Sequence, residues 1–200
     1  MKEEIIAIFG ASSTWGAWDF EKGGWANRLR LFFDKNDSNI FAYNLGISGN
    51  NSKGILNRIK IECEARCPTI IIISIGDNDS VENSYVYNSP EQFEENLIKS
   101  IKIAKKFTNK IVLLGTKKVD ESKTNPVSWD KNINYLNKNI NKYDLIIEDV
   151  ANKEKVKYLK MSDLINKEDL EDGLHPNSEG HKKIFEKVKE FLLNEFIEVK

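Results

Sequence analysis

The chain has 200 residues, of which 40% are hydrophobic and 30% are charged. With 30 basic and 31 acidic residues its formal net charge is −1, which argues against an electrostatic binder of nucleic acid or of anionic membranes. The length favours a single domain over residues 1–200. The longest apolar run, residues 69–75, is too short to cross a membrane, and residues 1–5 lack signal-peptide features. We therefore expect a cytoplasmic protein that does not insert into membranes.

Short β-rich runs alternate with longer amphipathic stretches along the chain. Strands are predicted at residues 5–9, 40–45, 69–75, 111–114 and 156–159, and helices at residues 25–35, 52–65, 90–107, 130–153 and 177–195. Ser89 and Pro90 suit the cap and first turn of the third helix, and residues 115–130 are predicted to form a long irregular loop. The alternation predicts an α/β fold: a three-layer, flavodoxin-like doubly wound sheet of about five parallel strands with helices on both faces.

The most informative segment lies near the end of the chain, at Asp172-Gly173-Leu174-His175-Pro176. An acid three residues before a histidine can hold one imidazole nitrogen and leave the other free to take a proton. A surface loop that happens to contain both residues is the alternative, because triads are recognised by geometry rather than by spacing. The second histidine, His181, is expected to be a surface or cap residue, and Asp19 and Glu21 are expected to be solvated.

Small or polar residues follow the first two predicted strands, where doubly wound folds bind their ligands. Gly10 allows a sharp turn after the first strand, and Ser12 then stands where its hydroxyl can project above the sheet. Gly49, after the second strand, can direct its backbone N–H towards a ligand oxygen. A helix-capping serine and a plain turn are the respective alternatives.

The segment after the third strand contains Asn78 between Asp77 and Asp79. Asn78 offers a side-chain amide donor, although asparagine is also a common turn former. The flanking acids raise the possibility of a magnesium site, which we disfavour because no acidic cluster follows the first strand. Cys63 and Cys67 have no accompanying histidine cluster, so we expect reduced, partly buried thiols and no metal site.

Together, these segments resemble the four signature blocks of the SGNH (GDSL-like) hydrolase superfamily, in order and over nearly the whole chain. The blocks are Gly10-Ala11-Ser12, Gly46-Ile47-Ser48-Gly49, Gly76-Asp77-Asn78-Asp79 and Asp172-Gly173-Leu174-His175-Pro176. Each pattern is weak alone, but four in order after the expected strands form a specific signal. The first block departs from the family at Ala11, where Asp is usual.

The resemblance implies a serine esterase that works through an acyl-enzyme. Ser12 would be the nucleophile, His175 the general base and Asp172 the residue that orients the imidazole. The backbone N–H groups of Ser12 and Gly49 and the side-chain amide of Asn78 would form the oxyanion hole. No metal or organic cofactor is implied.

Four tryptophans bear on the substrate. Trp15, Trp18 and Trp129 are candidates for the wall of a substrate pocket, whereas Trp25 is expected to pack in the core. We expect a small-molecule ester with a short acyl chain, acetylated sugars among them, because the chain lacks a broad apolar lid. A lysophospholipase, a thioesterase and a non-catalytic ligand-binding protein of the same fold are alternatives, as is a flavodoxin-like nucleotide or phosphate binder.

Overall fold

The five predicted strands form one parallel sheet. A computed structural model describes residues 3–36, 39–81 and 88–197 of the chain. The strands are β1 (Glu4–Gly10), β2 (Ile40–Gly46), β3 (Ile70–Ser74), β4 (Ile111–Leu114) and β5 (Lys157–Leu159), in the spatial order β2-β1-β3-β4-β5. This order confirms the flavodoxin-like prediction, and it places the reversal of winding direction between β1 and β3.

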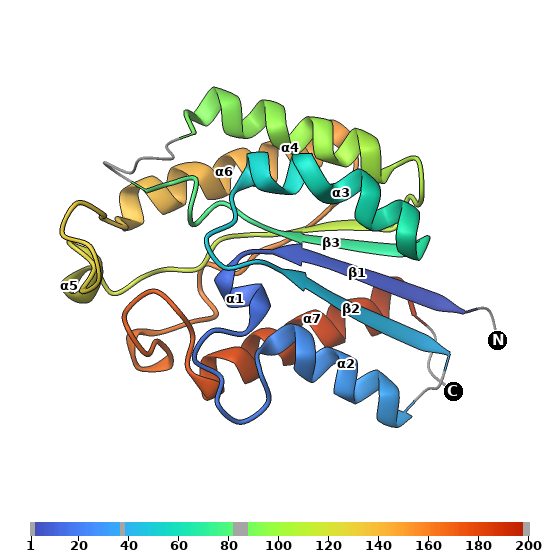
Figure 1. Cartoon of the computed structure of the whole chain (residues 1–200), viewed down its shortest axis with the longest axis horizontal. Helices are drawn as coiled ribbons and strands as arrows, with labels where there is room; N and C mark the ends of the chain where they lie inside the picture. Colours follow the sequence, from blue (N-terminus) through green and yellow to red (C-terminus); the bar gives the residue numbers. More distant parts are fainter. Residues whose placement is uncertain (1–2, 37–38, 82–87, 198–200) are drawn as a thin grey trace.

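Helices cover both faces of the sheet (Figure 1). On one face lie α2 (Trp25–Asn36) and α7 (Ser178–Glu195), and on the other lie α3 (Ser52–Arg66), α4 (Pro90–Ala104) and α6 (Asn137–Glu154). Residues of β1 alternate between the two layers, with Ile6 and Ile8 in the core beneath α2 and α7, and Ala7 and Phe9 in the opposite core. Because the sheet is buried on both faces, its central strands are apolar except at their ends, at Glu4 and Ser74.

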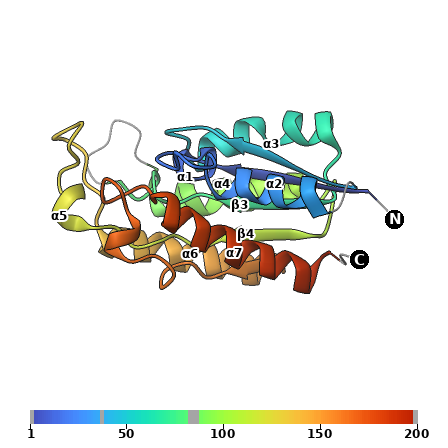
Figure 2. The same ribbon diagram turned by 90° about the horizontal axis from the view of Figure 1, so that it is seen from below.

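The register of the sheet brings three strand ends to one level. Gly10, the last residue of β1, pairs with Gly46 of β2 on one side and with Ser74 of β3 on the other. The loops that carry Ser12, Gly49 and Asn78 therefore leave the sheet side by side. Figure 2 shows the same end of the molecule from below, with α5 (Glu121–Thr124) beyond the carboxyl ends of the strands.

A third, smaller hydrophobic cluster lies at this end, separate from the two cores that flank the sheet. We call it the loop cluster. Its buried members are Val81, Val119, Val127, Tyr135, Ile140 and Leu174. Three of them, Val119, Val127 and Tyr135, come from the segment between β4 and α6, and Leu174 comes from the Asp172–Pro176 segment. The loop cluster therefore packs the β4–α6 connection against the segment that carries His175.

Some local predictions need correction. The predicted helix over residues 130–153 begins only at Asn137, because the preceding residues form turns in which Asp130 Oδ1 accepts from Asn132 N at 2.9 Å. The irregular connection after β4 also contains the short helix α5. The cap of α4 is as predicted, with Ser89 Oγ accepting from Gln92 N at 3.3 Å. No helix within the described ranges is long and apolar enough to span a membrane.

Candidate active site

Ser12 is the first residue of a short helix, α1 (Ser12–Trp15), that begins almost directly after β1. Two glycines allow this helix to lie against the strand ends. A Cβ at Gly10 would stand 2.0 Å from Thr14 Oγ1, and one at Gly46 would stand 2.2 Å from Trp15 N. The glycines therefore bring α1 onto the edge of the sheet, and Ser12 is left 9% exposed there.

The start of α1 has no acidic side chain at position 11. The Ala11 carbonyl accepts from Trp15 N at 2.8 Å, and no side-chain cap closes the helix. Arg58 braces the strand end instead, since its Nη2 donates to Gly10 O at 3.3 Å and its guanidinium lies 5.3 Å from the Phe9 ring centroid. The turn at Ala11, where the resemblance to the SGNH hydrolases leads one to expect Asp, is therefore held by backbone hydrogen bonds and by Arg58.

Ser12, His175 and Asp172 form a continuous chain of hydrogen bonds. Ser12 Oγ lies 2.8 Å from His175 Nε2, and His175 Nδ1 lies 2.7 Å from Asp172 Oδ2. The other carboxylate oxygen, Oδ1, accepts from the backbone N–H groups of Leu174 at 3.0 Å and His175 at 2.8 Å. The tight turn inferred from the sequence is thus closed by the acid itself, and it aims the imidazole at a hydroxyl 163 residues away.

The environment of Asp172 keeps its carboxylate ionised. Burial opposes ionisation, but the hydrogen bonds from the His175 side chain and backbone outweigh it and hold the pKa well below its usual range. Trp18 adds a further donor, with Nε1 at 2.9 Å from Asp172 Oδ2. Trp18 has a left-handed backbone (φ 67°), which is rare for a bulky residue. In this conformation the indole N–H faces Asp172, and the ring also lines an open cleft on the outer side of Ser12.

Gly49 and Asn78 stand on the loops that follow β2 and β3, the two strands that flank the end of β1 before Ser12. Gly49 has a φ of 76°, and among the described residues other than its two chain neighbours no atom lies within 4 Å of where its Cβ would be, so a ligand atom has room to approach. Asn78 Nδ2 donates to the Asn50 carbonyl at 2.7 Å, and Asn78 Oδ1 accepts from the Tyr135 hydroxyl at 2.9 Å. Tyr135 was not singled out from the sequence, because nothing in its local pattern indicates a contact with a residue 57 positions earlier.

Asp79 joins the loops that follow β2 and β3. It is fully buried, and it accepts hydrogen bonds from Ser52 N at 3.1 and 3.0 Å, from Ser52 Oγ at 2.6 Å and from Asn88 Nδ2 at 2.7 Å. Burial raises its pKa, although these hydrogen bonds act in the opposite direction. Asp79 is therefore used as a structural acceptor between the loops. Across the described ranges, no group of three or more His, Cys, Asp or Glu side chains is arranged to hold a metal ion.

His181, expected to be a surface or cap residue, and Asp19, expected to be solvated, are both buried. His181 is 0% exposed; its Nε2 lies 2.8 Å from the Ala17 carbonyl, and its Nδ1 accepts from Trp25 N at 3.2 Å. Burial lowers its pKa to about 4, so the ring is neutral at pH 7. Asp19 is also buried, with Oδ2 2.7 Å from Arg28 Nε and Oδ1 2.9 Å from Ser178 Oγ. Both residues anchor the loop after α1 to α2 and α7.

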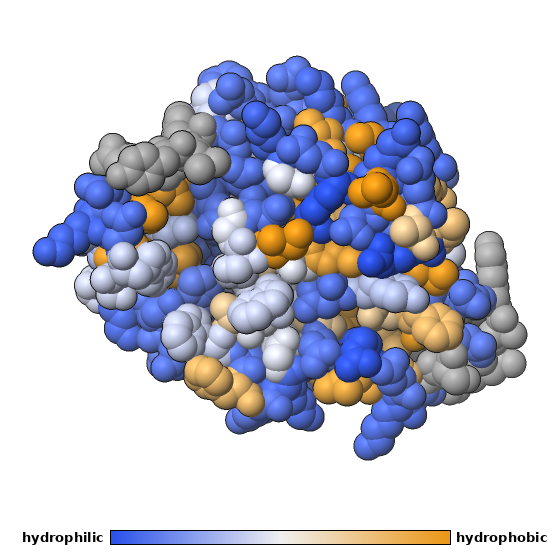
Figure 3. All heavy atoms as spheres, in the orientation of Figure 1, coloured by the Kyte–Doolittle hydropathy of each residue, from blue (hydrophilic) through white to orange (hydrophobic). Residues whose placement is uncertain are grey.

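An open cleft of about 820 Å³ lies on the outer side of Ser12 and His175. Trp15, Trp18 and Trp129 line it, so all three tryptophans singled out from the sequence are at the site. Trp15 is 60% exposed and Trp129 is 52% exposed, and the Trp129 ring centroid lies 6.1 Å from that of His175. In Figure 3 the hydrophilic surface is broken by pale and apolar side chains near the left and centre of the view. Trp25, by contrast, is buried in the core as predicted.

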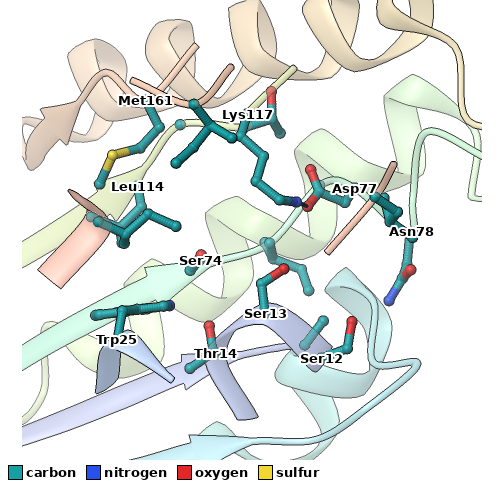
Figure 4. A pocket seen from close by; sticks show the side chains of 18 residues that line it. Ser12, Ser13, Thr14, Trp25, Ser74, Asp77, Asn78, Leu114, Lys117 and Met161 are labelled. Carbon is teal, nitrogen blue, oxygen red and sulfur yellow. Dashed lines mark hydrogen bonds and ion pairs between the residues drawn. The ribbon is translucent and has the colours of Figure 1, made fainter. Parts of the chain in front are cut away.

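A smaller cavity of about 40 Å³ lies on the inner side of α1 (Figure 4). Lys117 and Asp77 form an ion pair at its polar end, with Nζ and Oδ2 2.5 Å apart, whereas Trp25 and Met161 line its apolar end. Asp77 Oδ1 is buried and has no hydrogen-bond partner among the described residues. The site thus has an aromatic outer cleft and a partly charged inner wall, separated by the serine.

Solved structures resemble the chain over nearly its full length. A lipase/acylhydrolase from Enterococcus faecalis aligns with a TM-score of 0.76 at 16% identity and covers 96% of each chain. Axe2, an acetylxylan esterase from Geobacillus stearothermophilus, aligns with a TM-score of 0.75 at 17% identity and covers 98% of this chain and 96% of its own. LAE5, an α/β hydrolase enzyme from the metagenome of Lake Arreo, Spain, has a TM-score of 0.75 at 17% identity and covers 96% of this chain and 95% of its own. At these identities the likeness establishes the fold.

Sequence comparison supplies the family. No curated protein matches the chain. The model of the GDSL-like lipase/acylhydrolase family, however, matches residues 8–183, a range that contains all four signature blocks. This protein therefore belongs to the GDSL-like lipase/acylhydrolase family.

Proposed function

We propose that this protein is a serine esterase that cleaves small acyl esters, acetylated sugars among them, through an acyl-enzyme. The observation that carries the proposal is the hydrogen-bonded chain from Ser12 Oγ through His175 to Asp172, with spacings of 2.8 and 2.7 Å. These contacts join a hydroxyl, an imidazole base and a half-buried carboxylate in the order that nucleophilic catalysis requires.

In the first step, Ser12 Oγ attacks the ester carbonyl while His175 Nε2 takes the hydroxyl proton. Asp172 stabilises the resulting imidazolium and keeps its ring in place, without accepting the proton itself. The tetrahedral intermediate then collapses: the bond to the alkoxy oxygen breaks, His175 returns the proton to the leaving alcohol, and the acyl group stays on Ser12. Water, deprotonated by His175, releases the carboxylic acid by the reverse sequence.

The developing oxyanion would be held by three donors: the backbone N–H groups of Ser12 and Gly49 and the side-chain amide of Asn78. The sheet register supports this arrangement, because the three loops leave strand ends that are level with one another. In Figure 4 the amide nitrogen of Asn78 points towards the side on which the Ser12 hydroxyl lies. Preorganised donors of this kind commonly give the largest single contribution to acyl-transfer catalysis.

The outer cleft supports a small, partly polar substrate. Flat indole rings exposed beside a nucleophile can stack on a sugar ring or contact a short acyl group. Trp15 and Trp129 offer such surfaces, and the cleft they line is open to solvent. The acetylxylan esterase among the structural neighbours is consistent with an acetylated saccharide, which we propose as the first substrate class to test.

The test compares wild type with Ser12→Ala and Ser13→Ala on p-nitrophenyl esters of increasing chain length and on acetylated xylo-oligosaccharides. Ser13 is the matched control, since it is the adjacent serine and lines the inner cavity, whereas Ser12 also lines the outer cleft. We expect Ser12→Ala to abolish hydrolysis with the fold intact, and a fluorophosphonate probe to label Ser12 but not Ser13. Unchanged turnover of Ser12→Ala would refute the nucleophile, and a preference for long-chain esters would favour a lipase or lysophospholipase.

A further inference from the structure

The connection between β4 and α6 sends one side chain to the proposed oxyanion hole. Tyr135 lies just before α6, is 7% exposed and belongs to the loop cluster. Its hydroxyl donates to Asn78 Oδ1 at 2.9 Å. No signature block of the family includes this tyrosine, and the mechanism proposed above does not use it.

The partners of the Asn78 amide fix which end of it faces Ser12. The Asn50 carbonyl can only accept a hydrogen bond, so the Asn78 atom beside it, at 2.7 Å, must be the NH₂ group. The opposite end is then the carbonyl oxygen, which receives the Tyr135 hydroxyl. A rotated amide would set its oxygen against the Asn50 carbonyl, lose that hydrogen bond and the one donated by Tyr135, and present an oxygen lone pair to the oxyanion unless the Tyr135 hydroxyl also turned to accept. One N–H of Asn78 is thus engaged by Asn50, and the amide nitrogen that carries the second lies on the side of Ser12 (Figure 4).

Tyr135 is itself held firmly. Its backbone N–H donates to the Thr124 carbonyl at 3.0 Å, and its own carbonyl accepts from Thr124 Oγ1 at 2.9 Å. Burial, together with the nearby charges of Asp77 and Asp172, raises the pKa of its hydroxyl, which therefore remains a donor throughout the neutral and alkaline range in which esterases are assayed. A hydrogen bond donated to an amide oxygen also polarises that amide and strengthens its N–H as a donor.

We infer that Tyr135 is a positioning residue of the oxyanion hole, which holds the Asn78 amide with its N–H directed at the developing oxyanion. The inference rests on the proposed serine esterase function. It assigns the irregular connection after β4 a role in catalysis, although no residue of that connection has to touch the reacting atoms.

The experiment compares Tyr135→Phe with wild type on p-nitrophenyl acetate. Phe keeps the ring in the loop cluster and removes only the hydroxyl. We expect kcat to fall about tenfold, less than the 100- to 1,000-fold typical of deleting an oxyanion donor, with KM within about twofold. Tyr158→Phe is the matched control. Tyr158 lies in β5, and its hydroxyl donates to Asp144 Oδ2 of α6 at 3.0 Å, so the Tyr158→Phe protein should keep the wild-type kcat.

A double-mutant cycle with Asn78→Ala separates positioning from a general structural effect. In the Asn78→Ala background, Tyr135→Phe should have no further effect on kcat, because no amide remains to be oriented. An equal tenfold loss in both backgrounds would overturn the inference, as would a Tyr135→Phe protein that keeps the wild-type kcat or fails to fold. A wild type no more active than Ser12→Ala would instead refute the proposed function, and the inference with it.

Discussion

The buried, neutral His181 predicts a specific loss of stability on mild acidification. Its pKa falls from the ordinary value of 6.5 to about 4 in the folded protein because burial disfavours the charged ring. Between these values the unfolded chain binds a proton that the folded protein does not, so the free energy of unfolding decreases as the pH falls. At about 1.4 kcal/mol per pKa unit, the full effect is about 3 kcal/mol, of which about 2 kcal/mol is lost between pH 7 and pH 5.

Urea unfolding at several pH values between 7 and 5 measures this effect in wild type, His181→Gln and His175→Gln. The difference between wild type and His181→Gln should change by about 2 kcal/mol over this range, whatever the offset at pH 7. His175→Gln retains His181, so it should keep the steep dependence. With only two histidines in the chain, the His181 Cε1–H resonance is easily assigned by NMR, and it should not titrate above pH 5. Parallel curves for wild type and His181→Gln would refute the reasoning.

Three further substitutions test the site and its support. Asn78→Ala should lower kcat by about 100- to 1,000-fold with little change in KM, as steady-state kinetics would show; an equal change in both would contradict an oxyanion role. Trp18→Phe removes the donor to Asp172 but keeps an aromatic ring in the cleft, so kcat should fall by a few-fold; an unchanged kcat would contradict a supporting role for this hydrogen bond. Gly46→Ala places a methyl group 2.2 Å from Trp15 N and should lower the free energy of unfolding by about 1–3 kcal/mol; an unchanged Tm would show that α1 is not held closely against β2.

Much of the architecture was predictable because it depends on local patterns. All-apolar runs such as residues 70–73 indicate buried parallel strands, and polar or glycine-rich residues after them mark the functional edge. The positions of Ser12, Gly49 and Asn78 follow from this rule together with the strand order. The Asp172–Pro176 segment could be interpreted alone, because its acid closes its own turn through two backbone N–H groups.

The errors concern contacts between residues far apart in sequence. His181 stands beside two lysines in a polar stretch, which favours a surface position, yet its side chain faces Ala17 and Trp25. Asp19 is buried rather than solvated, and its partners, Arg28 and Ser178, come from two different helices, so no local pattern pairs them with it. Tyr135 was overlooked for the same reason. Buried polar groups are satisfied by whichever partner the tertiary structure brings near, and periodicity carries no information about that partner.

The loop cluster gives this end of the molecule a core of its own. Proteins open in cooperative units, and a small unit with few buried side chains opens at a lower free-energy cost than a central sheet. Leu174 ties the His175 turn to the loop cluster, and Tyr135 ties Asn78 to it. We therefore expect amide hydrogens of residues 119–135 and 173–175 to exchange with deuterium together, well before those of β1 and β3. A single local unfolding event would then disable the base and the amide donor at once, while the serine stays on an intact sheet.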